Sequence, residues 1–214
     1  MAKLNEFKRN YVKAIQEGYA AIFAGAGLSR PSGFVNWKEL LRDLAEEIQL
    51  DVDKESDLVE VAQYYCNEKR GRSEINNKIL NRFVTHSQEN TNLNLLANMP
   101  IKTYWTTNYD HIIEDTLRKT GKRIDIKMNS QSLANSLSDS DAVIYKMHGD
   151  YLDPSSCIIT KDDYELYNET HQLFSTALQG DLVSKTFLFI GFSFEDPNLK
   201  YILSRIRNLL DENR

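Results

Sequence analysis

The sequence has few cysteines and no excess of positive charge, and each shortage excludes a class of protein. Its 214 residues include two cysteines, Cys66 and Cys157, and no C-x-x-C pair. That count excludes a disulfide-rich scaffold and a four-cysteine zinc site within one chain. The formal net charge is −5, so no basic field attracts nucleic acid. Because the four histidines are also scattered, we expect no bound metal.

Long apolar runs are missing as well. No run approaches the ~20 apolar residues needed to span a bilayer. The first segment, MAKLNEFKRNYVKAIQ, carries charges throughout and lacks the apolar core of a signal peptide. We therefore expect no membrane partner and a cytoplasmic location. The composition, 41% hydrophobic and 27% charged, is typical of one globular domain with a sizeable core.

Short apolar segments alternate with segments of helical period, which predicts an α/β fold with a Rossmann-like parallel sheet and helices on both faces. Asn36 can cap a helix at residues 37–48. Between residues 57 and 99 the pattern is helical and polar, with a break at Gly71, so residues 50–100 are predicted to be a helical insertion. The continuous apolar run of the last strand predicts burial on both faces. The predicted strands are Tyr19–Ala24, Thr103–Thr107, Ile124–Met128, Ala142–Met147 and Thr186–Ile190.

Four of these strands end in small or polar residues. In an open parallel sheet, ligands bind beyond the carboxyl ends of the strands. Four such ends in one chain indicate a ligand-binding site more strongly than any one of them would. They are Gly25-Ala26-Gly27 with Ser29, Thr107-Asn108-Tyr109-Asp110, His148-Gly149-Asp150 and Gly191-Phe192-Ser193.

Each strand end allows a functional and an ordinary structural interpretation. Glycines after a buried strand can bring backbone amides to a phosphate, but they also make tight turns. The dehydrogenase pattern G-x-G-x-x-G fails, because Arg30 stands at the third glycine position. Asn108 can hold a ribose hydroxyl or orient a water, although it and Asp110 could simply cap a helix. His148 suits a general base near neutral pH, or a structural role in a turn.

Together the motifs carry a family resemblance. GAGLS, TTNYD, HGD and GFSF resemble the sirtuin motif set and occur in the sirtuin order. The longer stretches YWTTNYD, KMHGD, GDLVSKTFLFIGFSF and DPNLKYILSRIR resemble sirtuin-like effectors of bacterial antiphage defence, such as the NAD-cleaving effector of the Thoeris system. The resemblance implies that NAD+ is the substrate and that its depletion aborts infection.

The resemblance also implies roles for individual residues. Asn108 would position the nicotinamide ribose and the attacking water, and His148 would take a proton from a ribose hydroxyl. Asp110 matches the aspartate that holds the nicotinamide carboxamide. The remaining candidates for NAD+ binding are Ala24, Gly25, Ala26, Gly27 and Ser29 around the diphosphate and its ribose, Thr107 before the catalytic asparagine, and Gly191 and Ser193 at the adenosine ribose.

Some sirtuin features are missing. The four-cysteine zinc ribbon has no counterpart after His148, where only Cys157 occurs. The loop that pairs with an acyl-lysine substrate is also not recognisable. Val35-Asn36-Trp37-Lys38 stands where sirtuins have Pro-Asp-Phe-Arg, and Thr107 replaces the usual glutamine. Despite these departures we still expect NAD+ binding, but they disfavour peptide deacylation.

An NAD+ hydrolase is therefore the leading hypothesis. Its alternatives are an NAD-dependent protein deacylase with an unusual small domain, and a non-catalytic module that binds NAD or an ADP-ribose derivative. Thoeris effectors carry a second domain that senses a cyclic ADP-ribose signal, and they assemble into tetramers or filaments. By that resemblance we expect residues 1–214 to be one catalytic domain without the C-terminal sensing domain, and to form a homo-oligomer.

Overall fold

A parallel sheet forms the centre of the molecule. The computed structural model describes residues 2–34, 36–84, 88–194 and 196–211. The sheet has five strands in the order β3-β4-β2-β1-β5, and all four neighbouring pairs are parallel. This confirms the predicted Rossmann-like α/β fold. The strands are β1 (Ala20–Ala24), β2 (Thr103–Thr106), β3 (Ile124–Lys127), β4 (Ala142–Lys146) and β5 (Thr186–Ile190).

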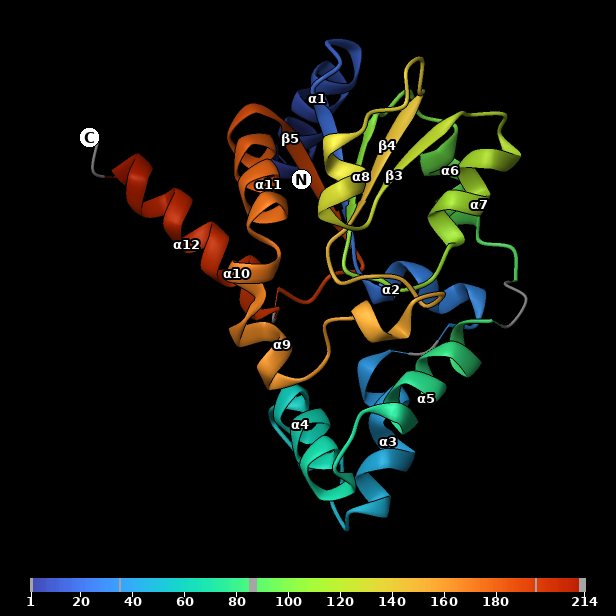
Figure 1. Cartoon of the computed structure of the whole chain (residues 1–214). Coiled ribbons are helices and arrows are strands. Elements are labelled where there is room, and N and C mark those ends of the chain that lie inside the picture. The colour runs from blue at the N-terminus through green and yellow to red at the C-terminus, as the bar shows by residue number, and fades with distance from the viewer. Residues whose placement is uncertain (1, 35, 85–87, 195, 212–214) are drawn as a thin grey trace.

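Alternate side chains of the strands enter two separate cores, one on each face of the sheet. Ile22 and Tyr104 belong to one buried cluster, whereas their chain neighbours Phe23 and Trp105 belong to the other. This is the period of two that a strand imposes on its side chains. Figure 1 shows helices on both sides of the sheet. The first cluster includes residues of α1 (Ala2–Gln16), α6 (Thr91–Ala97) and α7 (Ile112–Lys119); the second includes residues of α8 (Ser130–Ala134), α10 (Tyr167–Thr170), α11 (Gln172–Ser184) and α12 (Pro197–Asp211).

Helices α3 (Trp37–Glu47), α4 (Leu58–Lys69) and α5 (Ser73–Phe83) form a separate layer at the end of the molecule opposite α1 (Figure 1). The Asn36 side chain accepts from the Glu39 amide, and the Glu39 side chain accepts from the Asn36 amide. This reciprocal capping box starts α3 as predicted. The predicted break at Gly71 also separates α4 from α5.

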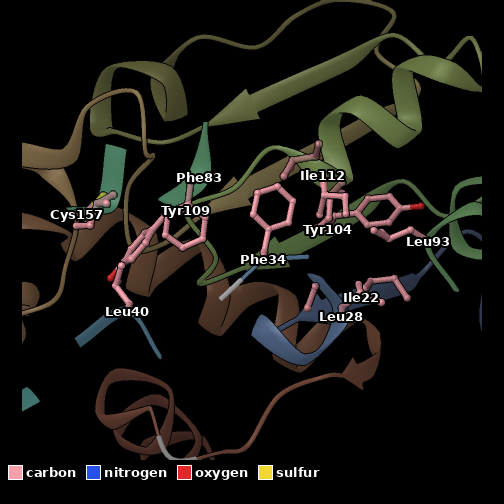
Figure 2. Packing of buried hydrophobic residues seen from close by; sticks show 14 of the residues in the cluster. Ile22, Leu28, Phe34, Leu40, Phe83, Leu93, Tyr104, Tyr109, Ile112 and Cys157 are labelled. Carbon is pink, nitrogen blue, oxygen red and sulfur yellow. The ribbon is translucent and has the colours of Figure 1, made fainter. Parts of the chain in front are cut away.

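One continuous core joins these helices to the sheet. Figure 2 shows Phe34, Phe83 and Tyr109 side by side, between Leu40 of α3 and the sheet residue Tyr104. The rings of Phe34 and Phe83 stack with their centroids 5.9 Å apart, and Tyr109 meets Phe83 edge-on with a centroid separation of 5.8 Å. Because aromatic side chains bury large apolar areas, this cluster holds the helical layer firmly against the carboxyl end of the sheet.

Two predicted features differ in the structure. The side chains of β5 are all half-buried, so the prediction of burial on both faces was wrong. The reason is that β5 lies at the edge of the sheet and pairs only with β1. Helix α7 begins at Ile112 instead of Tyr109, which leaves residues 107–111 as a turn beyond β2.

None of the helices in the described part of the chain has both the length and the apolar character to cross a membrane.

Short helices complete the carboxyl edge of the sheet. The short elements are α2 (Ala26–Ser29), α9 (Lys161–Glu165) and the 3-10 turns Arg30–Ser32 and Pro154–Ser156.

Candidate active site

Two adjoining cavities lie where the polar strand ends meet. The larger is a cleft of about 710 Å³, and the smaller is a pocket of about 50 Å³. Four residues line both of them: Ala26, Asn36, Trp37 and Thr107. The cavities are therefore one site with a wide outer part and a narrow inner part.

The glycine turns after β1 and β5 press directly against each other. A Cβ atom on Gly25 would lie 2.5 Å from the Gly191 carbonyl oxygen, and one on Gly191 would lie 2.2 Å from the Leu28 nitrogen. Gly191 also has a φ of +65°, which side chains disfavour. The Gly25 and Gly27 amides donate to the carbonyls of Ile190 and Gly191. In this structure, these glycines permit close packing of two turns, and their amides are already used within the protein.

Asn108 is fixed at the end of β2 by its neighbours. Its backbone N–H donates to the Thr106 hydroxyl, which itself donates to the Ala24 carbonyl. The Asn108 side-chain amide donates to the Ser29 hydroxyl at 3.0 Å. Helix α7 begins after His111 and the Asn108 side chain bonds Ser29 instead, so Asn108 does not cap α7.

Asp110 also lines the inner pocket, where it is 3% exposed. Its Oδ1 accepts from the Ile112 amide at the start of α7, so the helix-start interpretation is correct for this residue. Burial raises the pKa of the Asp110 carboxyl, and the nearby Lys146 charge counters part of that rise.

His148 follows β4 and lines the outer cleft, with only 1% of its surface exposed. Its Nε2 lies 3.4 Å from Oδ2 of Asp196, and among the described residues no hydrogen-bond partner is found for that nitrogen. The ring meets Tyr164 and Tyr167 edge-on. Burial lowers the pKa of His148, and the carboxylates of Asp196 and Asp163 counter part of the shift. A neutral, buried imidazole can accept a proton.

A second buried cluster lies on the other side of β4. The Lys146 ammonium is 3.1 Å from Glu114 and 2.8 Å from Asp150, and it donates to the carbonyls of Tyr109 and Asp110. His111 contacts both Asp150 oxygens, at 2.6 and 2.8 Å.

His111, Glu114 and Asp150 are close enough together to hold a metal ion. However, the Lys146 ammonium already supplies positive charge to both carboxylates. Burial alone would lower the pKa of Lys146, but the charges of Glu114 and Asp150 more than offset it, so its pKa lies above the ordinary value. The donor set therefore fits an ion-pair network better than a metal site.

Most of the predicted site residues come together around the two cavities. Ala24, the last residue of β1, and Gly25, in the turn after it, line neither cavity. Of the four residues that differ from the sirtuin Pro-Asp-Phe-Arg pattern, Asn36 and Trp37 line both cavities, and Val35 lies outside the described residues. The candidates that line a cavity are Ala26, Gly27, Ser29, Thr107, Asn108, Asp110, His148, Gly191 and Ser193.

The sequence patterns did not reveal two further cleft residues, Tyr164 and Asp196. Asp196 comes before Pro197, a pair of residues typical of a helix start, and it does cap α12 through the Leu199 amide. Its position beside His148 depends on a contact across 48 residues, which no local pattern encodes.

A parallel α/β sheet with these four strand ends defines the class of the protein. The sequence model of the SIR2-like domain matches residues 102–214, which is 113 of the 214 residues. The chain belongs to the SIR2-like domain family.

Particular relatives are similar over almost all of this chain. The NAD(+) hydrolase ThsA of Cytobacillus dafuensis is 51% identical over 205 residues, covering 96% of this chain and 41% of that protein. The NAD(+) hydrolase ThsA of Acinetobacter baumannii is 53% identical over 203 residues, covering 95% and 42%. Defense-associated sirtuin 2 of Bacillus subtilis is 25% identical over 214 residues, covering 94% and 21%. The chain thus spans less than half the length of these relatives.

Proposed function

We propose that this chain hydrolyses NAD+ to nicotinamide and ADP-ribose. The observation that carries the proposal is the placement of Asn108 and His148, a water-orienting amide and a base, at the ends of the neighbouring strands β2 and β4 beside one joined site. The relatives named NAD(+) hydrolase, at 51–53% identity, support the same activity.

The two cavities suit the two halves of a dinucleotide. The outer cleft of about 710 Å³ lies in the range of cofactor sites and is lined by Gly27, Gly191 and Ser193, where the diphosphate and adenosine ribose would bind. The inner pocket, lined by Asn108 and Asp110, would take the nicotinamide end. Thr107 lines both cavities, so the ribose that bears the scissile bond would lie beside it.

The chemistry requires little from the protein beyond positioning and one base. Cleavage between ribose C1′ and nicotinamide passes through an oxocarbenium-like state, as glycoside hydrolysis does. Asn108 orients a water toward C1′, and the water oxygen bonds to that carbon. The electron pair of the broken bond returns to the pyridinium nitrogen, which becomes neutral. His148 accepts a proton from a ribose hydroxyl, the hydroxyl oxygen takes up the proton that the attacking water releases, and the imidazolium passes its proton to solvent.

The deacylase alternative has less support from this structure. Cys157, the one cysteine after His148, is 1% exposed, and its Sγ lies 3.4 Å from the Asp150 carbonyl. Burial raises the pKa of this thiol to about 12, which disfavours the thiolate that zinc would need. We also infer that the cluster of His111, Glu114 and Asp150 binds no metal, since the buried Lys146 ammonium supplies the positive charge there.

We further propose a setting for the activity. The names of the relatives, an NAD(+) hydrolase and a defense-associated sirtuin, support an NAD+-cleaving effector of defence. From the motif resemblance we propose that it depletes NAD+ during phage infection and that it acts in the cytoplasm. By the same family relation, the domain would act as part of a homo-oligomer and beside a sensing domain. Light scattering of the chain in solution tests the oligomer: a mass of one chain at micromolar concentration contradicts it.

Product analysis tests the proposed reaction. The chain is incubated with NAD+ and no peptide, and nicotinamide and ADP-ribose are separated by chromatography. We expect turnover in the wild type and a loss of about 10²-fold or more in Asn108→Ala and His148→Ala. Asn67→Ala, on the exposed face of α4, is the matched control and should keep full activity.

Each other outcome identifies an alternative. Nicotinamide release that requires an acetylated peptide favours the deacylase. Saturable NAD+ binding by calorimetry without any product favours a binding module. Full activity in both Ala variants, with folding verified by circular dichroism, contradicts the assigned site.

A further inference from the structure

We propose that Asp196 is a positioning residue for His148: its carboxylate orients the imidazole and stabilises the imidazolium that forms when the base takes its proton. This inference rests on the proposed role of His148. The contact is direct, with Oδ2 of Asp196 3.4 Å from Nε2 of His148, and both side chains are at most 9% exposed.

Asp196 is itself held in place by two other elements. Its Oδ2 accepts from the Tyr164 hydroxyl of α9 at 3.1 Å, and its Oδ1 accepts from the Leu199 amide of α12 at 2.8 Å. A carboxylate fixed by both oxygens has little freedom to turn away from the ring. Its position is therefore suited to orienting another side chain.

Other groups that face His148 do not supply an equivalent charge. The Asp163 carboxylate pairs with Arg72 at 2.8 Å and accepts from the amides of Ile159 and Thr160. In the described part of the chain, Asp196 has no lysine or arginine partner. The groups around the imidazole are Asp163 and Tyr164 of α9, Tyr167 of α10, His171 after α10, and Asp196 before α12.

The charge of Asp196 matters because His148 is buried. Burial disfavours a charged imidazolium, and a carboxylate within ~4 Å favours it. At the 3.4 Å separation, Nε2 has no hydrogen bond to any residue that the structure describes. A ring that gains a proton is drawn toward the carboxylate, so the contact is strongest in the state that follows proton transfer.

The variant Asp196→Asn removes the charge and keeps the helix cap, since its Oδ1 can still accept from the Leu199 amide. The matched control is Asp57→Asn: Asp57 also lines the outer cleft and caps a helix, accepting from the Val59 amide at 2.9 Å. Asp57 is not among the charges that shift the His148 pKa. Both variants thus change a cleft-lining Asp to Asn at a helix start.

The experiment follows the imidazole titration of His148 by NMR, with its signal assigned by its loss in His148→Gln. In Asp196→Asn the midpoint should move to lower pH, because the protonated ring loses the carboxylate that stabilises its positive charge. The acid limb of NAD+ turnover should move in the same direction. Maximal turnover should fall about 10- to 100-fold, part of what general base catalysis supplies. In Asp57→Asn, the midpoint should stay in place.

An unchanged midpoint in Asp196→Asn, or the same shift in both variants, overturns the inference. The titration needs no turnover, so it also separates this inference from the proposed function. A wild type that cleaves no NAD+ but shows the specific shift contradicts the hydrolase while supporting the Asp196–His148 coupling. Urea unfolding verifies that both variants remain folded.

Discussion

Two buried polar clusters lie on opposite sides of β4 and differ in whether a buried cation balances their carboxylates. In the first, the Lys146 ammonium contacts two carboxylates and two backbone carbonyls, and His111 contacts the same Asp150. In the second, Nε2 of His148 has a carboxylate nearby but no hydrogen bond to any described residue.

This difference separates a structural role from a chemical one. A cluster that holds its own cation fixes the turn that carries Asn108 and Asp110, since the Lys146 ammonium donates to the carbonyls of Tyr109 and Asp110. A buried nitrogen without a partner costs stability, and native proteins keep such groups mainly where chemistry needs them. The comparison can be tested by four substitutions, given in decreasing order of their expected effect on stability.

The largest effect is expected from Lys146→Met. The variant leaves the carboxylates of Glu114 and Asp150 buried without their cation, which typically costs about 3–5 kcal/mol. Urea unfolding at neutral pH measures the change in unfolding free energy. Lys119→Met, at the exposed end of α7, is the matched control and should stay within about 0.5 kcal/mol of wild type. Similar values for the two variants contradict a structural role for the cluster.

Asp150→Asn should cost about 2 kcal/mol at neutral pH, since each pKa unit corresponds to ~1.4 kcal/mol. Burial alone would raise the pKa of Asp150, but the His111 hydrogen bond and the Lys146 charge lower it from 3.8 to about 2. The folded-state pKa is depressed, so this stabilisation is present above the ordinary value and is lost as the pH falls toward 2.

Unfolding experiments on a series of pH values test that sign. The wild type should lose its advantage over Asp150→Asn between about pH 5 and pH 2. If the difference in unfolding free energy between the two proteins stays constant across this range, the ionisation of Asp150 does not stabilise the fold.

The same substitution at Asp110 should have a smaller effect of opposite sign. Burial raises the pKa of the Asp110 carboxyl, so its charged form is disfavoured in the folded protein at neutral pH. Asp110→Asn keeps the acceptor for the Ile112 amide and removes that cost, so the unfolding free energy should rise. The difference in unfolding free energy between Asp110→Asn and the wild type should shrink as the pH falls through the raised pKa, because Asp110 then becomes neutral in the folded wild type as well. A loss of stability at neutral pH excludes this account.

The smallest change in stability is expected from His148→Leu. An apolar side chain removes the buried nitrogen, which has no hydrogen-bond partner among the described residues, so the unfolding free energy should stay within about 1 kcal/mol of wild type or rise. NAD+ turnover should nevertheless be lost. A large loss of stability would show that His148, like Lys146, has a structural role.

Local patterns predicted the parts of the fold that local interactions determine. The capping box at Asn36, the break at Gly71 and the polar ends of the strands each depend on residues close together in the chain. The parallel sheet then brings those ends to one edge, and most of the candidate residues line its cavities. The roles assigned to the individual residues remain predictions.

The features that the sequence did not predict depend on long-range packing. An apolar run cannot distinguish a central strand from an edge strand, so β5 was expected to be fully buried. Lys146 lies in a strand of alternating pattern, and its partner Glu114 comes 32 residues earlier. The positions of Tyr164 and Asp196 beside His148 likewise depend on how α9 and α12 pack after the chain has folded.

The contact between the two glycine turns restricts how this site can change over generations. A side chain at Gly25 or Gly191 meets main-chain atoms of the opposite turn, which no exchange of a neighbouring side chain can remove. In a saturation library, these positions should therefore accept almost no replacement and yield no second-site suppressors. The walls of the inner pocket, made of side chains such as Trp37 and Phe83, can vary in compensating pairs. Substitutions among relatives should therefore accumulate at the residues that form those walls, whereas Gly25 and Gly191 should stay the same.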